Sequence, residues 1–163
     1  MECDVLVVGA GPAGCSAAVA AAKLGVRTVI IDKRSVLGVP VQCAEHIPMP
    51  LAIETQLTPK TIAQEVAGTE VYIESEREAV TKAPGYILNR EIFDRNLAAE
   101  ALWNGARLLL DTTAVRRTER GALVRKGTYE SEIGCRIIIG ADGPASTVGN
   151  WADQNNTRFV RAM

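Results

Sequence analysis

The sequence predicts an α/β fold in which a parallel strand–helix–strand unit begins a larger domain with inserted antiparallel strands. Two short aliphatic runs at 3–8 and 27–31 flank an alanine-rich segment, as buried parallel strands flank their connecting helix. Hydrophobic residues make up 47% of the chain and aromatic residues only 4%, so the core has to be aliphatic. Later segments alternate apolar and polar residues between turn signals, which is typical of antiparallel strands.

Residues 1–35 form the predicted βαβ unit. The hexapeptide GAGPAG at 9–14 matches G-x-G-x-x-G directly after the first strand and at the start of the helix. Gly9 permits the tight turn, Gly11 lets the backbone approach a pyrophosphate, and Gly14 lets the helix pack closely on the strands. The helix N-terminus offers its N–H groups to phosphates. This pattern predicts a Rossmann-like dinucleotide site.

Asp32 closes the second strand, where an acid accepts hydrogen bonds from ribose hydroxyls and disfavours a 2′-phosphate. The acid therefore argues against NADP. The alternative is a glycine-rich turn without a ligand, and the glycines alone do not choose between FAD and NAD.

Segment 36–59 contains Gly38, Pro40, Pro48 and Pro50, and we expect one long irregular loop, which in a compact domain is usually functional. Segment 60–134 is expected to be an insertion. In it an amphipathic helix at 91–104 is followed by short strands, the later ones an antiparallel meander. Its predicted strands are 70–73, 79–82, 86–88, 107–110, 115–118, 122–125 and 129–133.

Residues 135–150 predict a buried return strand that runs into Gly140-Ala141-Asp142-Gly143. Beside the first strand, this turn would put Asp142 near the cofactor phosphates and Gly143 where a side chain would clash. The alternative is an ordinary Asp-Gly turn. The segment resembles the GADG motif of the flavoprotein superfamily that includes the aromatic hydroxylases. That resemblance favours FAD and one FAD/NAD(P)-binding domain over 1–163.

Two further segments resemble one family. The stretch 33–45 (KRSVLGVPVQCAE) is similar to K-R…G-x-P-V-x-C-x-E, and 85–94 (GYILNREIFD) to G-Y-x-L-x-R-x-x-F-D, both of geranylgeranyl reductases, including those of digeranylgeranylglycerophospholipids. The resemblance implies an FAD enzyme that saturates C=C bonds of prenyl chains in isoprenoid lipids by hydride transfer from reduced flavin. NAD(P)H or ferredoxin would be the electron donor.

The resemblance also implies which residues bind FAD, while no catalytic residue is assigned. The implied contacts are Ala13, Asp32, Lys33, Cys43, Ala44 and Arg90, with Asp142 and Gly143 beside the phosphates. Cys43 would lie near the flavin ring, in a loop covering it. Arg90 could instead be a solvated charge, and Cys43 an incidental small hydrophobe. Glu45 in the same loop could be an acid near the ring or a surface carboxylate.

His46 departs from the family pattern, which has glycine there, and the histidine could crowd the flavin or redirect the loop. Asp32 replaces the more frequent glutamate, which shortens its reach. Members of the family also continue beyond the point where this chain stops. We therefore expect an incomplete portion of a reductase, in which a possible partner chain supplies the missing half. The alternatives are a non-catalytic FAD-binding module, an electron-transfer flavoprotein–quinone oxidoreductase-like protein, or a hydroxylase.

Composition excludes other classes. The net charge is −1 and the basic residues are scattered, which argues against a nucleic-acid partner. One histidine and four widely spaced cysteines make a metal site improbable. No apolar run is long enough to span a bilayer. We therefore expect a cytoplasmic protein, or one peripheral to the membrane.

Overall fold

The computed structural model describes residues 1–41, 43–55 and 57–159. The chain forms two compact units, the first from Met1–Val39 with Asp94–Met163 and the second from Pro40–Phe93. Each unit is described by itself.

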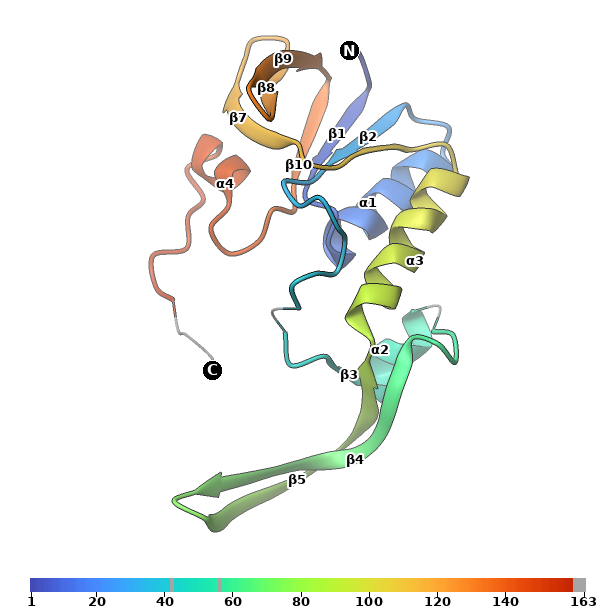
Figure 1. The fold of residues 1–163 in the computed structure, drawn as a ribbon, viewed down its shortest axis with the longest axis vertical. Helices are drawn as coiled ribbons and strands as arrows, with labels where there is room; N and C mark the ends of the chain where they lie inside the picture. The colour runs from blue at the N-terminus through green and yellow to red at the C-terminus, as the bar shows by residue number, and fades with distance from the viewer. Residues whose placement is uncertain (42, 56, 160–163) are drawn as a thin grey trace. The chain divides into compact units, whose positions relative to one another are not determined.

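A four-stranded parallel sheet lies at the centre of the first unit, in the order β10-β1-β2-β6 (Figure 1). Every neighbouring pair is parallel, as the aliphatic runs predict. The strands are β1 (Val5–Val8), β2 (Thr28–Ile31), β6 (Arg107–Leu109) and β10 (Ile137–Gly140). The βαβ unit and the pairing of the return strand with β1 are therefore confirmed. The expected burial of the return strand is wrong, because β10 lies at the edge of this sheet and Ile137 is 57% exposed.

Two layers cover opposite faces of this sheet (Figure 1). One layer contains the helix α1 (Pro12–Lys23) and the part of α3 (Arg90–Trp103) that belongs to the first unit. The other is an antiparallel meander, which confirms the predicted one. Its strands are β7 (Thr113–Arg117), β8 (Gly121–Lys126) and β9 (Tyr129–Gly134). A short helix, α4 (Thr147–Trp151), follows β10.

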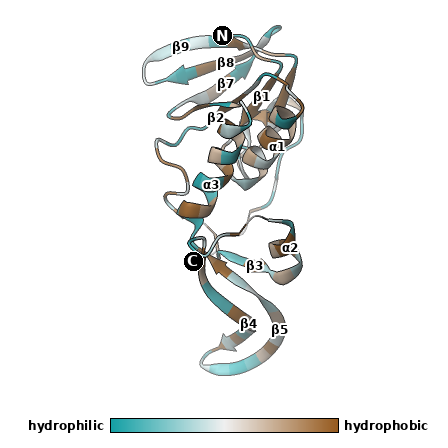
Figure 2. Cartoon of the chain, turned by 90° about the vertical axis from the view of Figure 1, so that its right-hand side faces the viewer, coloured by the Kyte–Doolittle hydropathy of each residue, from teal (hydrophilic) through white to brown (hydrophobic). Residues whose placement is uncertain are grey.

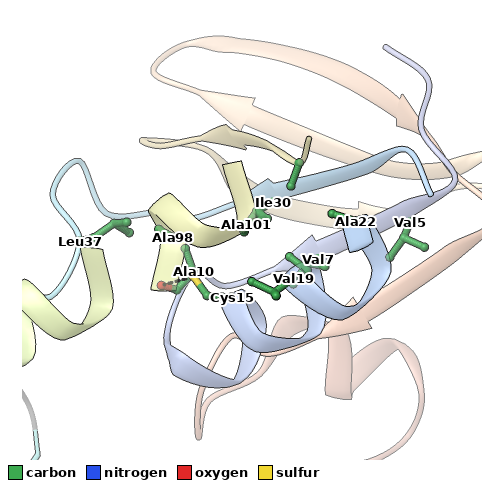
Figure 3. Close-up of a cluster of buried hydrophobic side chains, with 12 residues drawn as sticks. Val5, Val7, Ala10, Cys15, Val19, Ala22, Ile30, Leu37, Ala98 and Ala101 are labelled. Atoms are coloured by element: carbon green, nitrogen blue, oxygen red, sulfur yellow. Dashed lines mark hydrogen bonds between the residues drawn. The ribbon is translucent and has the colours of Figure 1, made fainter. Parts of the chain in front are cut away.

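Alternation along β1 and β2 divides the core into two clusters. Val5, Val7 and Ile30 pack with α1 and α3, whereas Leu6 and Ile31 pack with the meander. On the helical side the buried residues are small, with Ala98 and Ala101 of α3 close to α1 (Figure 3). Small side chains let the two helices approach the sheet closely, so the alanine-rich sequence of α1 serves packing as well as helix propensity.

The second unit is built on an antiparallel sheet in the order β3-β5-β4. Its elements are β3 (His46–Pro48), α2 (Met49–Glu54), β4 (Ile62–Ile73) and β5 (Glu76–Leu88). Figure 2 shows hydrophobic and hydrophilic segments in turn along β4 and β5. Most residues of the two strands are exposed, so this hairpin does not form a buried core of its own.

Two sequence expectations need correction here. The strands expected at 70–73, 79–82 and 86–88 belong to one long hairpin, whose register shifts absorb its irregular residues. The segment 36–59 is not wholly irregular, because it contains β3 and α2. Pro48 is the N-cap of α2 and Pro50 lies in its first turn, where a missing N–H breaks no helical hydrogen bond.

The predicted insertion 60–134 is also divided differently in the structure. Its hairpin belongs to the second unit, whereas β6 pairs with β2 and the meander packs on the parallel sheet. The helix expected at 91–104 is present as α3, one residue earlier at each end. Its N-terminal residues fall in the second unit, and Asp94 onward in the first.

Candidate functional site

Three loops leave the sheet at its carboxyl edge, which is the side formed by the C-terminal ends of its strands. Val8, Ile31 and Gly140 end β1, β2 and β10 in matching register. The chain moves from β1 to β2 on one side, and β10 lies on the other side of β1. This is a topological switch point, and open α/β sheets bind ligands beyond the carboxyl ends of their strands at such points.

The glycine loop after β1 has the backbone that its sequence predicts. Gly9 has a φ of +104°, and a Cβ there would collide with the Ala141 carbonyl oxygen. A Cβ on Gly14 would collide with the Gly9 carbonyl oxygen. Both glycines are therefore required by the fold itself. Cys15 of α1 stabilises the loop, because its Sγ donates a hydrogen bond to the Ala10 carbonyl at 3.4 Å.

Gly11 differs from these two glycines, because a Cβ there would meet no protein atom within 4 Å. It is the N-cap of α1 and has no side-chain capping bond, and the first turn holds no acidic residue. Ala13 is exposed on this turn. The uncapped N–H groups and the positive end of the helix dipole therefore stay available to an anion. This cradle fits a pyrophosphate.

Asp32 lies at the same edge, directly beside the glycine loop. Its side chain is 5% exposed, and its Oδ2 accepts a 2.7 Å hydrogen bond from the Ala10 N–H. Arg34 donates to Oδ1 through its backbone N–H at 2.8 Å and its Nε at 3.0 Å, and to Oδ2 through Nη2 at 3.0 Å. The acid predicted to bind the ribose is thereby held in place from two sides.

These contacts decide the charge of Asp32. Burial acts to raise the pKa of the carboxyl, but the hydrogen bonds from Arg34 and Ala10 outweigh it and hold the pKa below its usual value. The acid is therefore ionised at neutral pH. The resemblance implied Lys33, which is exposed. The sequence analysis assigned no role to Arg34, although this residue belongs to the K-R pair of the segment that resembles the family and lies two residues after the acid.

The turn after β10 lies against the glycine loop, because the Ala141 N–H donates to the Val8 carbonyl at 2.8 Å. Asp142 itself points into α4, where it accepts from the Ser146 hydroxyl and from the N–H of Thr147 at 2.6 Å. The Asp142 carboxylate thus accepts from N–H groups at the start of α4, whose N-cap residue is Ser146. Its contact with the cofactor phosphates stays a prediction.

Gly143 belongs to the same turn, and its place beside the phosphates stays a prediction. A Cβ there would meet no protein atom within 4 Å, so no clash inside the protein demands glycine. The residue has a φ of +87°, and this conformation is what favours glycine.

The remaining predicted contacts belong to the second unit. Cys43 and Ala44 are exposed, and the Glu45 N–H donates to the Cys43 Sγ at 3.4 Å. Arg90 is half-buried at the first position of α3 and has interactions of its own. These three residues and the carboxyl edge belong to different units, so the contacts of the three residues with FAD stay predictions.

His46, which departs from the family pattern, is an ordinary strand residue. It pairs with Ile87 of β5, and its Nε2 would lie 2.9 Å from a Cβ on Gly85. The left-handed backbone belongs to Glu45, with a φ of +62°. The histidine therefore occupies space above Gly85 and needs no glycine-only conformation at its own position.

The fold and this edge define a dinucleotide-binding α/β protein, and comparison with known proteins gives the family. A model described as FAD dependent oxidoreductase matches residues 4–146. The chain belongs to this family, and FAD is thereby confirmed as its cofactor.

Similar proteins carry the name expected from the sequence. Digeranylgeranylglycerophospholipid reductase 3 of Methanosphaera stadtmanae is 38% identical over 168 residues, covering 94% of this chain and 42% of that protein. Digeranylgeranylglycerophospholipid reductase 1 of Methanothermobacter thermautotrophicus is 39% identical over 178 residues, covering 99% and 44%. These matches confirm the resemblance to geranylgeranyl reductases. The chain spans less than half the length of these relatives.

A solved structure agrees. The geranylgeranyl bacteriochlorophyll reductase-like protein of Thermoplasma acidophilum superposes with a TM-score of 0.83 at 34% identity, covering 98% of this chain and 44% of that one. Among the residues that the structure describes here, no helix is long and apolar enough to cross a membrane, and no cluster of His, Cys, Asp or Glu could hold a metal ion.

Proposed function

We propose that this chain supplies the FAD-binding part of a reductase that saturates C=C bonds of prenyl chains in isoprenoid lipids. The observation that carries the proposal is the carboxyl-edge cradle of Gly11, the α1 N-terminus and Asp32. It occurs in a chain 34–39% identical to proteins named digeranylgeranylglycerophospholipid reductase. The cradle accounts for binding, and the relatives' names indicate the chemistry.

The chain's own residues hold and orient the cofactor. The backbone at Gly11 and the N–H groups of the first turn of α1 would bind the pyrophosphate, and the Asp32 carboxylate would accept from the ribose hydroxyls. When bound and reduced, FAD supplies the hydride that adds to one alkene carbon. Anchoring the ADP half at these fixed donors determines where the flavin half can lie.

The remaining contacts with FAD are those that the family resemblance implies. Cys43 and Ala44 would lie along the isoalloxazine, Arg90 would bind the phosphate or ribose region, and Asp142 would lie beside the phosphates. Exposure of Cys43 and Ala44 supports this assignment, since a buried side chain could not meet a cofactor. NAD(P)H or ferredoxin would supply the electrons, and a possible partner chain the rest of the substrate site. The protein would act in the cytoplasm or at the membrane surface.

The test uses purified protein under anaerobic conditions. It is loaded with FAD, reduced with dithionite and incubated with a geranylgeranylated glycerophospholipid, both alone and with the remaining part of a longer relative added, and the lipid is analysed by mass spectrometry. We expect a gain of two hydrogen atoms for each saturated double bond. Dithionite with lipid alone, and FAD-loaded protein without dithionite, are the controls.

Three outcomes are informative. Lipid reduction supports the proposal. A yellow protein that leaves the lipid unchanged but passes electrons to a quinone overturns it in favour of an electron-transfer protein. A protein that takes up FAD but carries out neither reaction, even with the remaining part of a longer relative added, overturns it in favour of a binding module.

A further inference from the structure

The carboxylate of Asp32 is already fully hydrogen-bonded by the protein. Its Oδ1 accepts from the backbone N–H and the Nε of Arg34, and its Oδ2 accepts from the Ala10 N–H and Nη2 of Arg34, at 2.7–3.0 Å. A carboxylate offers about four lone-pair positions, and all are in use. Ribose hydroxyls can therefore bind Asp32 only if one of these four donors moves away or shares its acceptor oxygen with them.

Two of the four donors, Nε and Nη2, belong to the Arg34 guanidinium, and these two can move. The backbone around it is fixed, because the Asp111 N–H donates to the Arg34 carbonyl at 3.0 Å and the Thr112 N–H to the Asp32 carbonyl at 2.9 Å. Ala10 is fully buried in the glycine loop. The Arg34 side chain is 31% exposed, so its guanidinium can rotate toward solvent while the backbone stays in place.

A second acid lies near the guanidinium. Asp94 of α3 is 2% exposed and belongs to the same unit. The pKa of Arg34 is raised first by its hydrogen bond to Asp32, against the lowering effect of burial, and further by the charges of Asp32 and Asp94. Withdrawal from Asp32 would therefore leave the guanidinium in a field that still favours its charge.

We propose that Arg34 competes with the FAD ribose for Asp32 and thereby sets the protein's affinity for FAD. Arg34 is a positioning residue, because it acts through Asp32. Without the ribose it keeps a buried carboxylate paired and ionised, which avoids the penalty of an uncompensated buried charge. When the ribose binds, the guanidinium gives up its hydrogen bonds to Asp32. The inference rests on the FAD site under Proposed function.

The chain contains a matched control. Arg27 forms the same paired contact with Asp4 at the other end of the sheet, through Nε at 2.9 Å, Nη2 at 2.8 Å and its backbone N–H at 3.2 Å. Removing Arg27 therefore removes an Arg–Asp pair of the same geometry away from the carboxyl edge.

The experiment measures FAD affinity and thermal stability at pH 8 for wild type, Arg34→Ala, Arg34→Lys and Arg27→Ala. We expect Arg34→Ala to melt at a lower temperature without FAD and to bind FAD roughly 3- to 10-fold more tightly, because the competing donor is gone. Its FAD-induced rise in Tm is then larger than that of wild type. Arg34→Lys, with a charge but no fork, lies between them, and Arg27→Ala binds FAD like wild type.

If Arg34 only held Asp32 in place and did not compete with the ribose, its removal would weaken FAD binding instead of strengthening it. Weaker FAD binding by Arg34→Ala, in a variant whose melting stays cooperative, overturns the inference while leaving the FAD site intact. Equal FAD affinity in wild type and both Arg34 variants overturns it too. Wild-type protein that binds no FAD overturns the site itself and the inference with it.

Discussion

The two ends of the parallel sheet use the same pair of residue types in different surroundings. At the amino ends of β1 and β2, Asp4 pairs with Arg27, and the two side chains are 28% and 67% exposed. At the carboxyl ends, Asp32 pairs with Arg34, at 5% and 31%. Each arginine also donates its backbone N–H to its acid.

The two ion pairs have the same chemistry and differ in burial, so burial is what distinguishes the pair at the carboxyl edge from the pair at the amino ends. An exposed pair exchanges its water contacts for protein contacts at little gain, so Asp4 and Arg27 only tie two strand ends together. The buried pair holds a charge beside a loop with an uncapped helix N-terminus. A buried carboxylate interacts strongly with a ligand bound next to it, because little solvent screens its charge.

The largest difference between the two ends is expected from glycine substitutions. Gly14→Ala should lower the free energy of unfolding by about 3 kcal/mol or more, because the new Cβ meets the Gly9 carbonyl and the helix has to move off the strand. Gly25→Ala, at the amino end, should lower it by about 1 kcal/mol, since its φ of +75° is strained but nothing lies within 4 Å. Urea denaturation measures both, and similar losses would contradict the comparison.

The next difference concerns the two acids. Asp32→Asn should raise the Kd for FAD about 10- to 100-fold, because charge-assisted bonds to the ribose are lost. Asp4→Asn keeps its shape at the opposite end and should leave the Kd within about twofold of wild type. Titration of protein fluorescence with FAD measures both variants. A Kd that rises equally in both would show that the effect comes through the fold.

The outcome at this edge shows how far the sequence predicts the site. Gly9, Gly14 and Asp32 follow from spacing, because a βαβ unit fixes where the backbone turns and where the second strand ends. Arg34 did not follow, since its pairing depends on a side-chain rotamer after the strand. Asp142 shows the same limit, because its turn was predicted and its helix-capping bonds were not.

The second unit shows why regular elements can be missed. Pro48 and Pro50 read as loop residues, but proline is compatible with a helix start, and α2 begins there. The hairpin of β4 and β5 was divided because local alternation breaks at its register shifts. Such breaks are absorbed by pairing across strands, which a single stretch of sequence does not reveal.

The smallest difference is expected in acid. The hydrogen bond from Arg27 lowers the pKa of Asp4 from 3.8 to about 2, so its stabilising effect is complete above the unfolded value and is lost as the pH falls through about 2. The pKa of Asp32 is also lowered, so its contribution disappears in the same direction. Both Asp4→Asn and Asp32→Asn should therefore flatten the fall in unfolding free energy below pH 4. Added salt should diminish the Asp4 part more, because the exposed pair is screened. Denaturation curves at high and low salt measure this, and an Asp32 part that is equally salt-sensitive would show that its burial gives it no protection.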